Sequence, residues 1–211
     1  MKIKQTIVLL RHATAMKNLQ GIHGGKGTDL IEPATSEIYD IGNRLLQLPI
    51  LFETIIHTPR QQCMQTAQLL SKLLNVKFIE LQELEPISLG IVDGLSDQEV
   101  TNKYSEIGEK LAKWRNGEIE INQLEIPQMT DCRIFFDRGK KFIDDLISKK
   151  ESTIIISSRS ILVLLMNVLL GRNPEVGGNY REVKWENAKF VVFTISDIGK
   201  SFHLDVSTVQ I

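Results

Sequence analysis

The sequence predicts an α/β fold: a three-layer sandwich with a mostly parallel central sheet and helices on both faces. Three observations predict it. Short apolar runs, such as residues 4–10 and 153–157, alternate with longer segments whose apolar residues recur at helical spacing. These runs are continuous, which is typical of strands buried on both faces. The chain closes with two strand-like segments around a short turn, which predicts an antiparallel edge.

The first half of the chain is predicted to contain three strands. A Gly-, Lys- and Asn-rich loop over 13–33 follows the first strand. The next segment has apolar residues at helical spacing, and Thr35 or Ser36 is the expected N-cap. Pro59 is expected to open the following helix. The expected elements are a strand at 4–10, a helix at 35–48, a strand at 53–58, a helix from 59 to 74 and a strand at 76–81.

The second half is predicted to begin with a loop that ends at a helix. Ser96 and Glu99 have capping-box spacing, so a helix should start there and run toward Trp114. The remaining expected elements are a loop at 116–128, a helix at 130–149, a strand at 153–157, a helix at 160–170, a loop at 171–179, and strands at 188–196 and 201–207 joined by a turn at 197–200.

Length and composition predict one domain over 1–211, with residues 96–130 as a cap or insert. The chain has 211 residues, 42% of them hydrophobic. Its 25 basic and 26 acidic residues give a net charge of −1, which argues against a broad nucleic-acid surface. The apolar runs are too short to span a membrane, and the two cysteines lack CxxC spacing. We therefore expect a cytoplasmic protein without a membrane or nucleic-acid partner.

The most informative pair of residues is Arg11-His12, directly after the first predicted strand. Ligands of open α/β sheets bind at the carboxyl ends of the strands. A neutral imidazole is a good nucleophile toward phosphorus, and a guanidinium is a forked donor to phosphate oxygens. The four histidines have no metal-ligand spacing, so no metal site is expected.

Four motifs in order extend this interpretation. They are "LLRHATAMKN" after the first strand, "TPRQQCMQTAQLL" after the second, "GIVDGLS" after the third, and "WENAKFVVFTI" at the penultimate strand. With these motifs the chain resembles the histidine phosphatase superfamily, which contains the cofactor-dependent phosphoglycerate mutases. The resemblance spans nearly the whole chain and implies a phosphoglycerate mutase-like fold.

The resemblance also implies a mechanism through a covalent phosphohistidine, with neither metal nor cofactor. By matching positions, His12 would be the nucleophile, Arg11 a phosphate clamp and Asn18 a donor on the phosphate side. Glu85, with Glu83 as the alternative, would protonate the leaving oxygen. The substrate would be a small phosphorylated or otherwise anionic molecule.

The sequence departs from the family pattern inside the expected phosphate pocket. Ala13 replaces the usual glycine after the histidine. Gln62 stands where an arginine is expected, and Ser158 where the second histidine is expected. Loss of one preorganised donor typically costs about two to three orders of magnitude in rate. The residues that could compensate are Arg159, Arg60 and His57, together with His23 and Lys26 in the loop after the first motif.

Three functions therefore remain open on the sequence. The first is a phosphomonoester hydrolase with a degenerate or remodelled phosphate pocket. The second is a catalytically inactive phosphatase fold that binds an anionic ligand or a partner. The third is a transferase repurposed on the same scaffold. The oligomeric state is also open, and the final strand pair would offer an edge for a homodimer.

Overall fold

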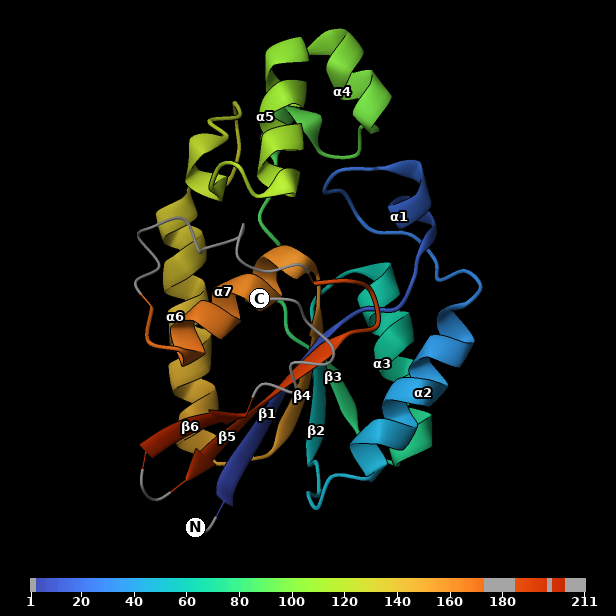
Figure 1. The fold of residues 1–211 in the computed structure, drawn as a ribbon, viewed down its shortest axis with the longest axis vertical. Helices are drawn as coiled ribbons and strands as arrows, with labels where there is room; N and C mark the ends of the chain where they lie inside the picture. Colours follow the sequence, from blue (N-terminus) through green and yellow to red (C-terminus); the bar gives the residue numbers. More distant parts are fainter. Residues whose placement is uncertain (1–2, 173–184, 197–198, 204–211) are drawn as a thin grey trace.

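The fold is built around one mixed six-stranded sheet with the order β3-β2-β4-β1-β5-β6 (Figure 1). The computed structural model describes residues 3–172, 185–196 and 199–203. Parallel pairing joins β3, β2, β4 and β1, whereas β5 pairs antiparallel with β1 and β6 antiparallel with β5. The predicted sandwich with an antiparallel edge is confirmed. The strands are β1 (Ile3–Arg11), β2 (Thr54–His57), β3 (Phe78–Glu80), β4 (Thr153–Ser157), β5 (Phe190–Ser196) and β6 (Gly199–His203).

Helices cover both faces of the sheet, with α2 and α3 on one side and α6 and α7 on the other (Figure 1). Strand β1 shows why its apolar run is continuous: Ile7 and Leu9 pack into the core beside α6 and α7, whereas Val8 and Leu10 pack into the core beside α2 and α3. The helices are α1 (Met16–Gln20), α2 (Ala34–Leu46), α3 (Gln61–Leu74), α4 (Asp97–Lys103), α5 (Ser105–Asn116), α6 (Cys132–Lys149) and α7 (Arg159–Leu169), with 3-10 turns η1 (Gly90–Val92) and η2 (Ile121–Gln123).

Several predicted boundaries differ from the observed ones for local reasons. The predicted loop 13–33 contains the short helix α1. Helix α2 starts directly after Pro33, so neither Thr35 nor Ser36 is its N-cap. The helix expected from Ser96 to Trp114 is interrupted at Tyr104, whose φ of −144° is not helical. Most of the predicted loop 171–179, half of the turn 197–200 and residues 204–207 lie outside the described residues.

The segment predicted to be a cap, residues 96–130, stands above the carboxyl ends of the parallel strands in Figure 1. Ser96 accepts a hydrogen bond from the Glu99 amide and completes the predicted capping box at the start of α4. Buried Leu111 and Trp114 of α5 belong to the same core cluster as residues of α6 and α7. This continuity favours our interpretation of one domain with a cap rather than two domains.

The cap and the two residues directly before it are also bonded to the loop that follows the first motif. The His23 amide donates to the Leu95 carbonyl at 3.0 Å, and the Gly94 amide donates to the His23 carbonyl at 2.8 Å. His23 Nε2 lies 2.8 Å from Asp97 Oδ1, and the Arg115 guanidinium binds both oxygens of Asp97. The pKa of His23 is lowered, first by burial and then by Arg115. The sequence-based candidate His23 therefore lies in the contact between loop and cap.

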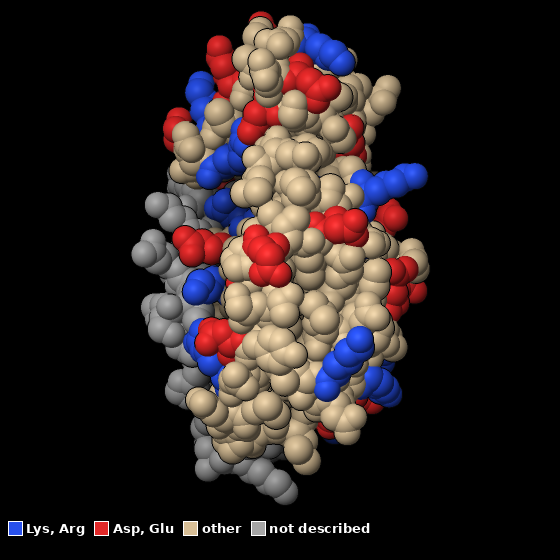
Figure 2. All heavy atoms as spheres, turned by 90° about the vertical axis from the view of Figure 1, so that its right-hand side faces the viewer, with Lys and Arg blue, Asp and Glu red and all other residues tan. Residues whose placement is uncertain are grey.

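The face of the molecule shown in Figure 2 carries mixed charge. On the face shown in Figure 2, lysine and arginine side chains are interspersed with aspartate and glutamate, and uncharged atoms cover most of the area. This distribution fits the net charge of −1. Within the described part of the chain, no helix has the length and apolar content needed to cross a membrane.

Candidate active site

His12 lies buried at the carboxyl end of β1, with 3% of its surface exposed. Its Nδ1 is 2.8 Å from the Ala13 carbonyl oxygen. A carbonyl only accepts hydrogen bonds, so this contact, which is shorter than the 3.3 Å between Nδ1 and the Asn187 amide nitrogen, favours the tautomer with the ring proton on Nδ1. The lone pair is therefore on Nε2. A neutral imidazole held in this tautomer is ready to act as a nucleophile or a base.

The charge state of His12 follows from its surroundings. Burial lowers its pKa to about 3, and the neighbouring Arg11 guanidinium and the Lys17 ammonium lower it in the same direction. The hydrogen bond to Ala13 opposes this shift. The imidazole is thus neutral throughout the physiological range of pH.

This lowered pKa predicts a pH-dependent stability. The ordinary histidine pKa is 6.5 and the folded-state value is about 3, so the unfolded chain gains a proton that folded His12 does not. The contribution of neutral, buried His12 to the free energy of unfolding is complete above about pH 6.5. It is lost as the pH falls from there toward 3. Its slope approaches about 1.4 kcal/mol per pH unit. Urea unfolding between pH 7.5 and 5 should show a steeper loss for wild type than for His12→Asn, and parallel slopes would contradict the assignment.

An asparagine outside the predicted site holds the backbone around His12. The Asn187 side-chain amide donates to the carbonyls of His12 at 3.1 Å and Ala13 at 3.3 Å, and to Asn18 Oδ1 at 3.2 Å. Asn18 Oδ1 also accepts from the Ala15 amide at 3.0 Å. The structure therefore brings the predicted Asn18 close to His12. The sequence indicated Asn187 only through the "WENAKF" motif before β5.

Further bonds fix the loop after His12. The Ala13 amide donates to Thr66 Oγ1 of α3 at 3.1 Å, and the Thr14 amide donates to Glu37 of α2 at 2.8 Å. Ala13 is fully buried and is not among the described residues with positive φ, so alanine suits this position. The Arg11 guanidinium donates to the Trp185 carbonyl. The backbone after His12 is thus held by α2 and α3, which cover the same face of the sheet.

Gln62 holds loop 27–30 in place and brings no charge to the site around His12. It is 1% exposed, and its Oε1 accepts a hydrogen bond from the Thr28 amide at 3.2 Å. A Cβ at Gly27 would come within 2.2 Å of that same oxygen, so glycine permits the close approach. Farther along α3, Gln65 accepts from the Leu30 amide at 2.8 Å. Helix α3 therefore holds loop 27–30 through its glutamines.

Ser158 and Arg159 lie at the beginning of α7. Ser158 is the N-cap residue, half-buried, and its hydroxyl is 3.3 Å from the Ser160 hydroxyl. Arg159 is the first residue of the helix and is also half-buried. The preceding Ser157 is fully buried, and its hydroxyl is 3.0 Å from that of Thr58 at the end of β2. The ends of β2 and β4 are thereby linked.

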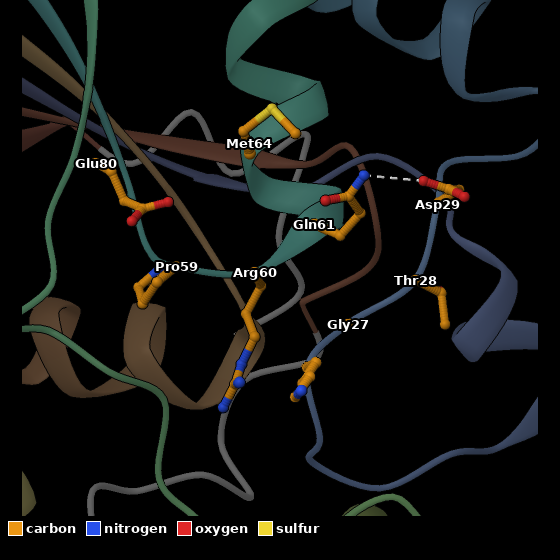
Figure 3. A pocket seen from close by; sticks show the side chains of 9 residues that line it. Gly27, Thr28, Asp29, Pro59, Arg60, Gln61, Met64 and Glu80 are labelled. Carbon is orange, nitrogen blue, oxygen red and sulfur yellow. Dashed lines mark hydrogen bonds between the residues drawn. The ribbon is translucent and has the colours of Figure 1, made fainter.

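Arg60 lines a cavity of about 580 Å³ between the start of α3, loop 26–29 and the end of β3 (Figure 3). In Figure 3 the Arg60 side chain extends away from Met64, and Gln61 donates to Asp29 at 3.0 Å. The predicted compensator Lys26 lines the same cavity but is exposed. The structure thus brings two of the candidate cations to one cavity.

His57 and the two candidate acids occupy other surroundings. His57 is 2% exposed, its ring packs against Phe78 with centroids 5.8 Å apart, and its Nδ1 is 3.1 Å from the Thr58 carbonyl. Glu83 and Glu85 are exposed and line a separate cavity of about 620 Å³ beside α6. The described structure therefore does not bring these three residues into contact with His12.

Lys17 is a cation near His12 that the sequence analysis did not select. It lies in the short helix α1, half-buried, and its Nζ donates to the Gly24 carbonyl at 2.6 Å. Its positive charge makes the smallest of the contributions that lower the pKa of His12. The available signal was its position directly before Asn18 in the first motif. Among the described residues, no group of His, Cys, Asp and Glu side chains could hold a metal ion.

A sequence model of the histidine phosphatase superfamily, branch 1, matches residues 7–206. The chain belongs to the histidine phosphatase superfamily. No curated protein matches it.

Solved structures of similar fold agree with this membership. One is the α-ribazole phosphatase of Shigella flexneri, at 17% identity and a TM-score of 0.76, with 95% of each chain covered. A mycobacterial glucosyl-3-phosphoglycerate phosphatase in complex with VO3 has 16% identity and a TM-score of 0.73, covering 96% of this chain and 98% of its own. YhfR of Bacillus stearothermophilus has 13% identity and a TM-score of 0.77, covering 95% of this chain and 96% of its own. At these identities the likeness establishes the fold.

Proposed function

We propose that this histidine phosphatase superfamily member is a phosphomonoester hydrolase that forms a phosphohistidine on His12. The observation that carries the proposal is the geometry of His12: a buried, neutral ring whose Nδ1 proton is held by the Ala13 carbonyl, beside Arg11. The lone pair on Nε2 fits in-line attack on a phosphoryl group. Superfamily membership supports a hydrolase of this kind.

The proposed reaction has two displacements. His12 Nε2 forms a bond to phosphorus as the ester P–O bond breaks, and the leaving oxygen takes a proton from a carboxylic acid. Water then attacks phosphorus, the P–N bond breaks and the carboxylate takes the proton of that water. In this scheme Arg11 stabilises the phosphoryl oxygens, while Asn18 and Asn187 hold the loop that carries the nucleophile. The roles of Asn18, His57 and Arg159 in substrate binding remain predictions.

A second candidate function is anion binding without turnover. Two positions of the pocket favour it, because neither Gln62, which supports loop 27–30, nor Ser158, whose hydroxyl is near Ser160, carries a charge. The two functions are separated by a panel of phosphomonoesters with detection of inorganic phosphate. The hydrolase requires release above background that saturates with substrate. Saturable binding of vanadate without phosphate release from any ester would favour the inactive binder.

Glu85 remains the proposed proton donor, with Glu83 as the alternative, on the sequence resemblance alone, because both line a cavity separate from His12. A general acid matters most for a poor leaving group, so Glu85→Gln should lower kcat/KM for an alkyl phosphate by about 10² to 10³ while changing the 4-nitrophenyl ester much less. Steady-state kinetics on both esters tests this expectation. Glu83→Gln is the matched control, since both side chains are exposed and line the same cavity. Equal effects of Glu85→Gln on the two esters would exclude Glu85 as the acid.

A further inference from the structure

The peptide group between Ala13 and Thr14 lies directly beside the proposed nucleophile. Its carbonyl oxygen is 2.8 Å from His12 Nδ1, and its N–H donates to Glu37 Oε2 of α2 at 2.8 Å. Because a peptide group is planar, its C=O and its N–H cannot turn independently of each other. The side chain that holds the Thr14 amide therefore also holds the acceptor that orients the His12 ring.

Glu37 binds Thr14 with both oxygens of its carboxylate. Its Oε1 accepts from the Thr14 hydroxyl at 2.7 Å, while its Oε2 accepts from the amide. The Ile31 amide donates to the Thr14 carbonyl at 3.1 Å, so each polar group of Thr14 has a partner. Hydrogen bonds to a carboxylate are roughly twice as strong as those between neutral groups. Thr14 is thereby fixed to the first turn of α2.

The negative charge of Glu37 also polarises this peptide group. Hydrogen bonds in series strengthen one another, so a carboxylate that accepts from the N–H makes the C=O of the same peptide a better acceptor. In the proposed reaction the His12 ring gains positive charge when Nε2 bonds to phosphorus, and Nδ1–H carries part of that charge. Asn187 and Thr66, which also bond the backbone beside His12, are uncharged. Glu37 therefore adds an electrostatic contribution that these two residues do not.

We propose that Glu37 is a positioning residue that acts on His12 through the Ala13–Thr14 peptide group, keeping the ring proton on Nδ1 and the lone pair on Nε2. The tautomer of a histidine is set by the hydrogen bond that its other nitrogen makes, and the group that orients that partner shares in the control. The expected effect on rate rests on the proposed function. The expected effect on the tautomer does not.

Imidazole ¹⁵N NMR of the full chain tests the tautomer without a substrate, and His12→Asn identifies the His12 signals. Wild type near neutral pH should carry the His12 proton on Nδ1 alone. Glu37→Ala should show both tautomers, because the Ala13 carbonyl loses its fixed direction. Glu37→Gln should resemble wild type, since its amide can accept from the Thr14 N–H and donate to the Thr14 hydroxyl oxygen. Asp40→Ala removes an exposed carboxylate from the same helix and is the matched control.

Steady-state kinetics with 4-nitrophenyl phosphate then measure the effect on rate, after thermal unfolding has shown that each variant is folded. Glu37→Ala should lower kcat about 10- to 100-fold and change KM by less than about threefold, since a displaced nucleophile slows the chemical step more than it weakens binding. Glu37→Gln should restore most of kcat, and Asp40→Ala should match wild type.

The two measurements separate this inference from the hydrolase. If Glu37→Ala keeps the single tautomer of wild type, or hydrolyses the ester with the wild-type kcat, the role of Glu37 is overturned and the hydrolase is not. A wild-type ring with its proton on Nε2, and Nδ1 accepting from the Asn187 amide, would also overturn it. If no ester is hydrolysed but Glu37→Ala changes the tautomer, the hydrolase falls and the positioning of His12 by Glu37 stands. If neither hydrolysis nor a change of tautomer is observed, both fall.

Discussion

Replacing His12 with alanine should reduce kcat for phosphomonoester hydrolysis by at least about 10⁴-fold, because the proposed covalent intermediate loses its nucleophile. Water could still attack a bound ester directly, but without the alignment that Nε2 provides. The measurement is release of inorganic phosphate at saturating substrate. Folding of the variant is checked by its cooperative thermal transition, and kinetics are recorded well below that transition.

A core substitution provides the control for loss of the fold. Leu45→Ala in α2 removes a side chain that is 1% exposed and belongs to the core between α2, α3 and the sheet. It should lower the free energy of unfolding by about 2–5 kcal/mol yet leave kcat of the folded protein within a few-fold of wild type. If His12→Ala kept more than a hundredth of wild-type kcat, His12 would not be the nucleophile.

Replacing Gln62 with arginine should damage the protein, although it restores the residue expected from the family pattern. The Gln62 side chain is buried beneath loop 27–30, and its oxygen accepts from the Thr28 amide. Arginine is longer and offers no acceptor, so the Thr28 amide would lose its partner and the loop would be displaced at Gly27. The free energy of unfolding should fall by about 2–4 kcal/mol, and kcat/KM should fall with it.

Urea unfolding and steady-state kinetics measure these two effects. Gln61→Arg is the matched control, because it adds the same group one residue earlier on α3 at an exposed position. Its unfolding free energy should stay within about 1 kcal/mol of wild type. A rise in kcat/KM for Gln62→Arg without loss of stability would indicate a phosphatase pocket that has decayed. The proposal that Gln62 is needed to hold loop 27–30 would then be wrong.

Much of the fold could be predicted because local features of the sequence, such as apolar runs and helix caps, agree with the tertiary structure. The continuous apolar run of β1 is buried on both sides of the sheet, as Ile7 and Val8 show by packing into different cores. The capping box at Ser96 marks the start of α4 correctly. The break at Tyr104 could not be predicted, since the apolar spacing continues through it and only the backbone conformation of the cap ends the first helix.

The site was harder to predict because the hydrogen bonds that hold its backbone join residues far apart in the sequence. Motif order placed Arg11, His12 and Asn18 at one strand end, and the structure brings Asn18 to the backbone near His12 through Asn187. Nothing in the local sequence shows that Gln62 contacts the Thr28 amide, 34 residues away.

The most direct test of the central claim is to trap the phosphorylated enzyme. Wild type mixed with a phosphomonoester and quenched within milliseconds should carry one phosphate that is stable in base and lost in acid, and peptide mass spectrometry should place it on His12. The matched His12→Ala sample should carry none. Hydrolysis of the ester with no such phosphate at any quench time, or with the phosphate on another residue, would contradict the proposed mechanism.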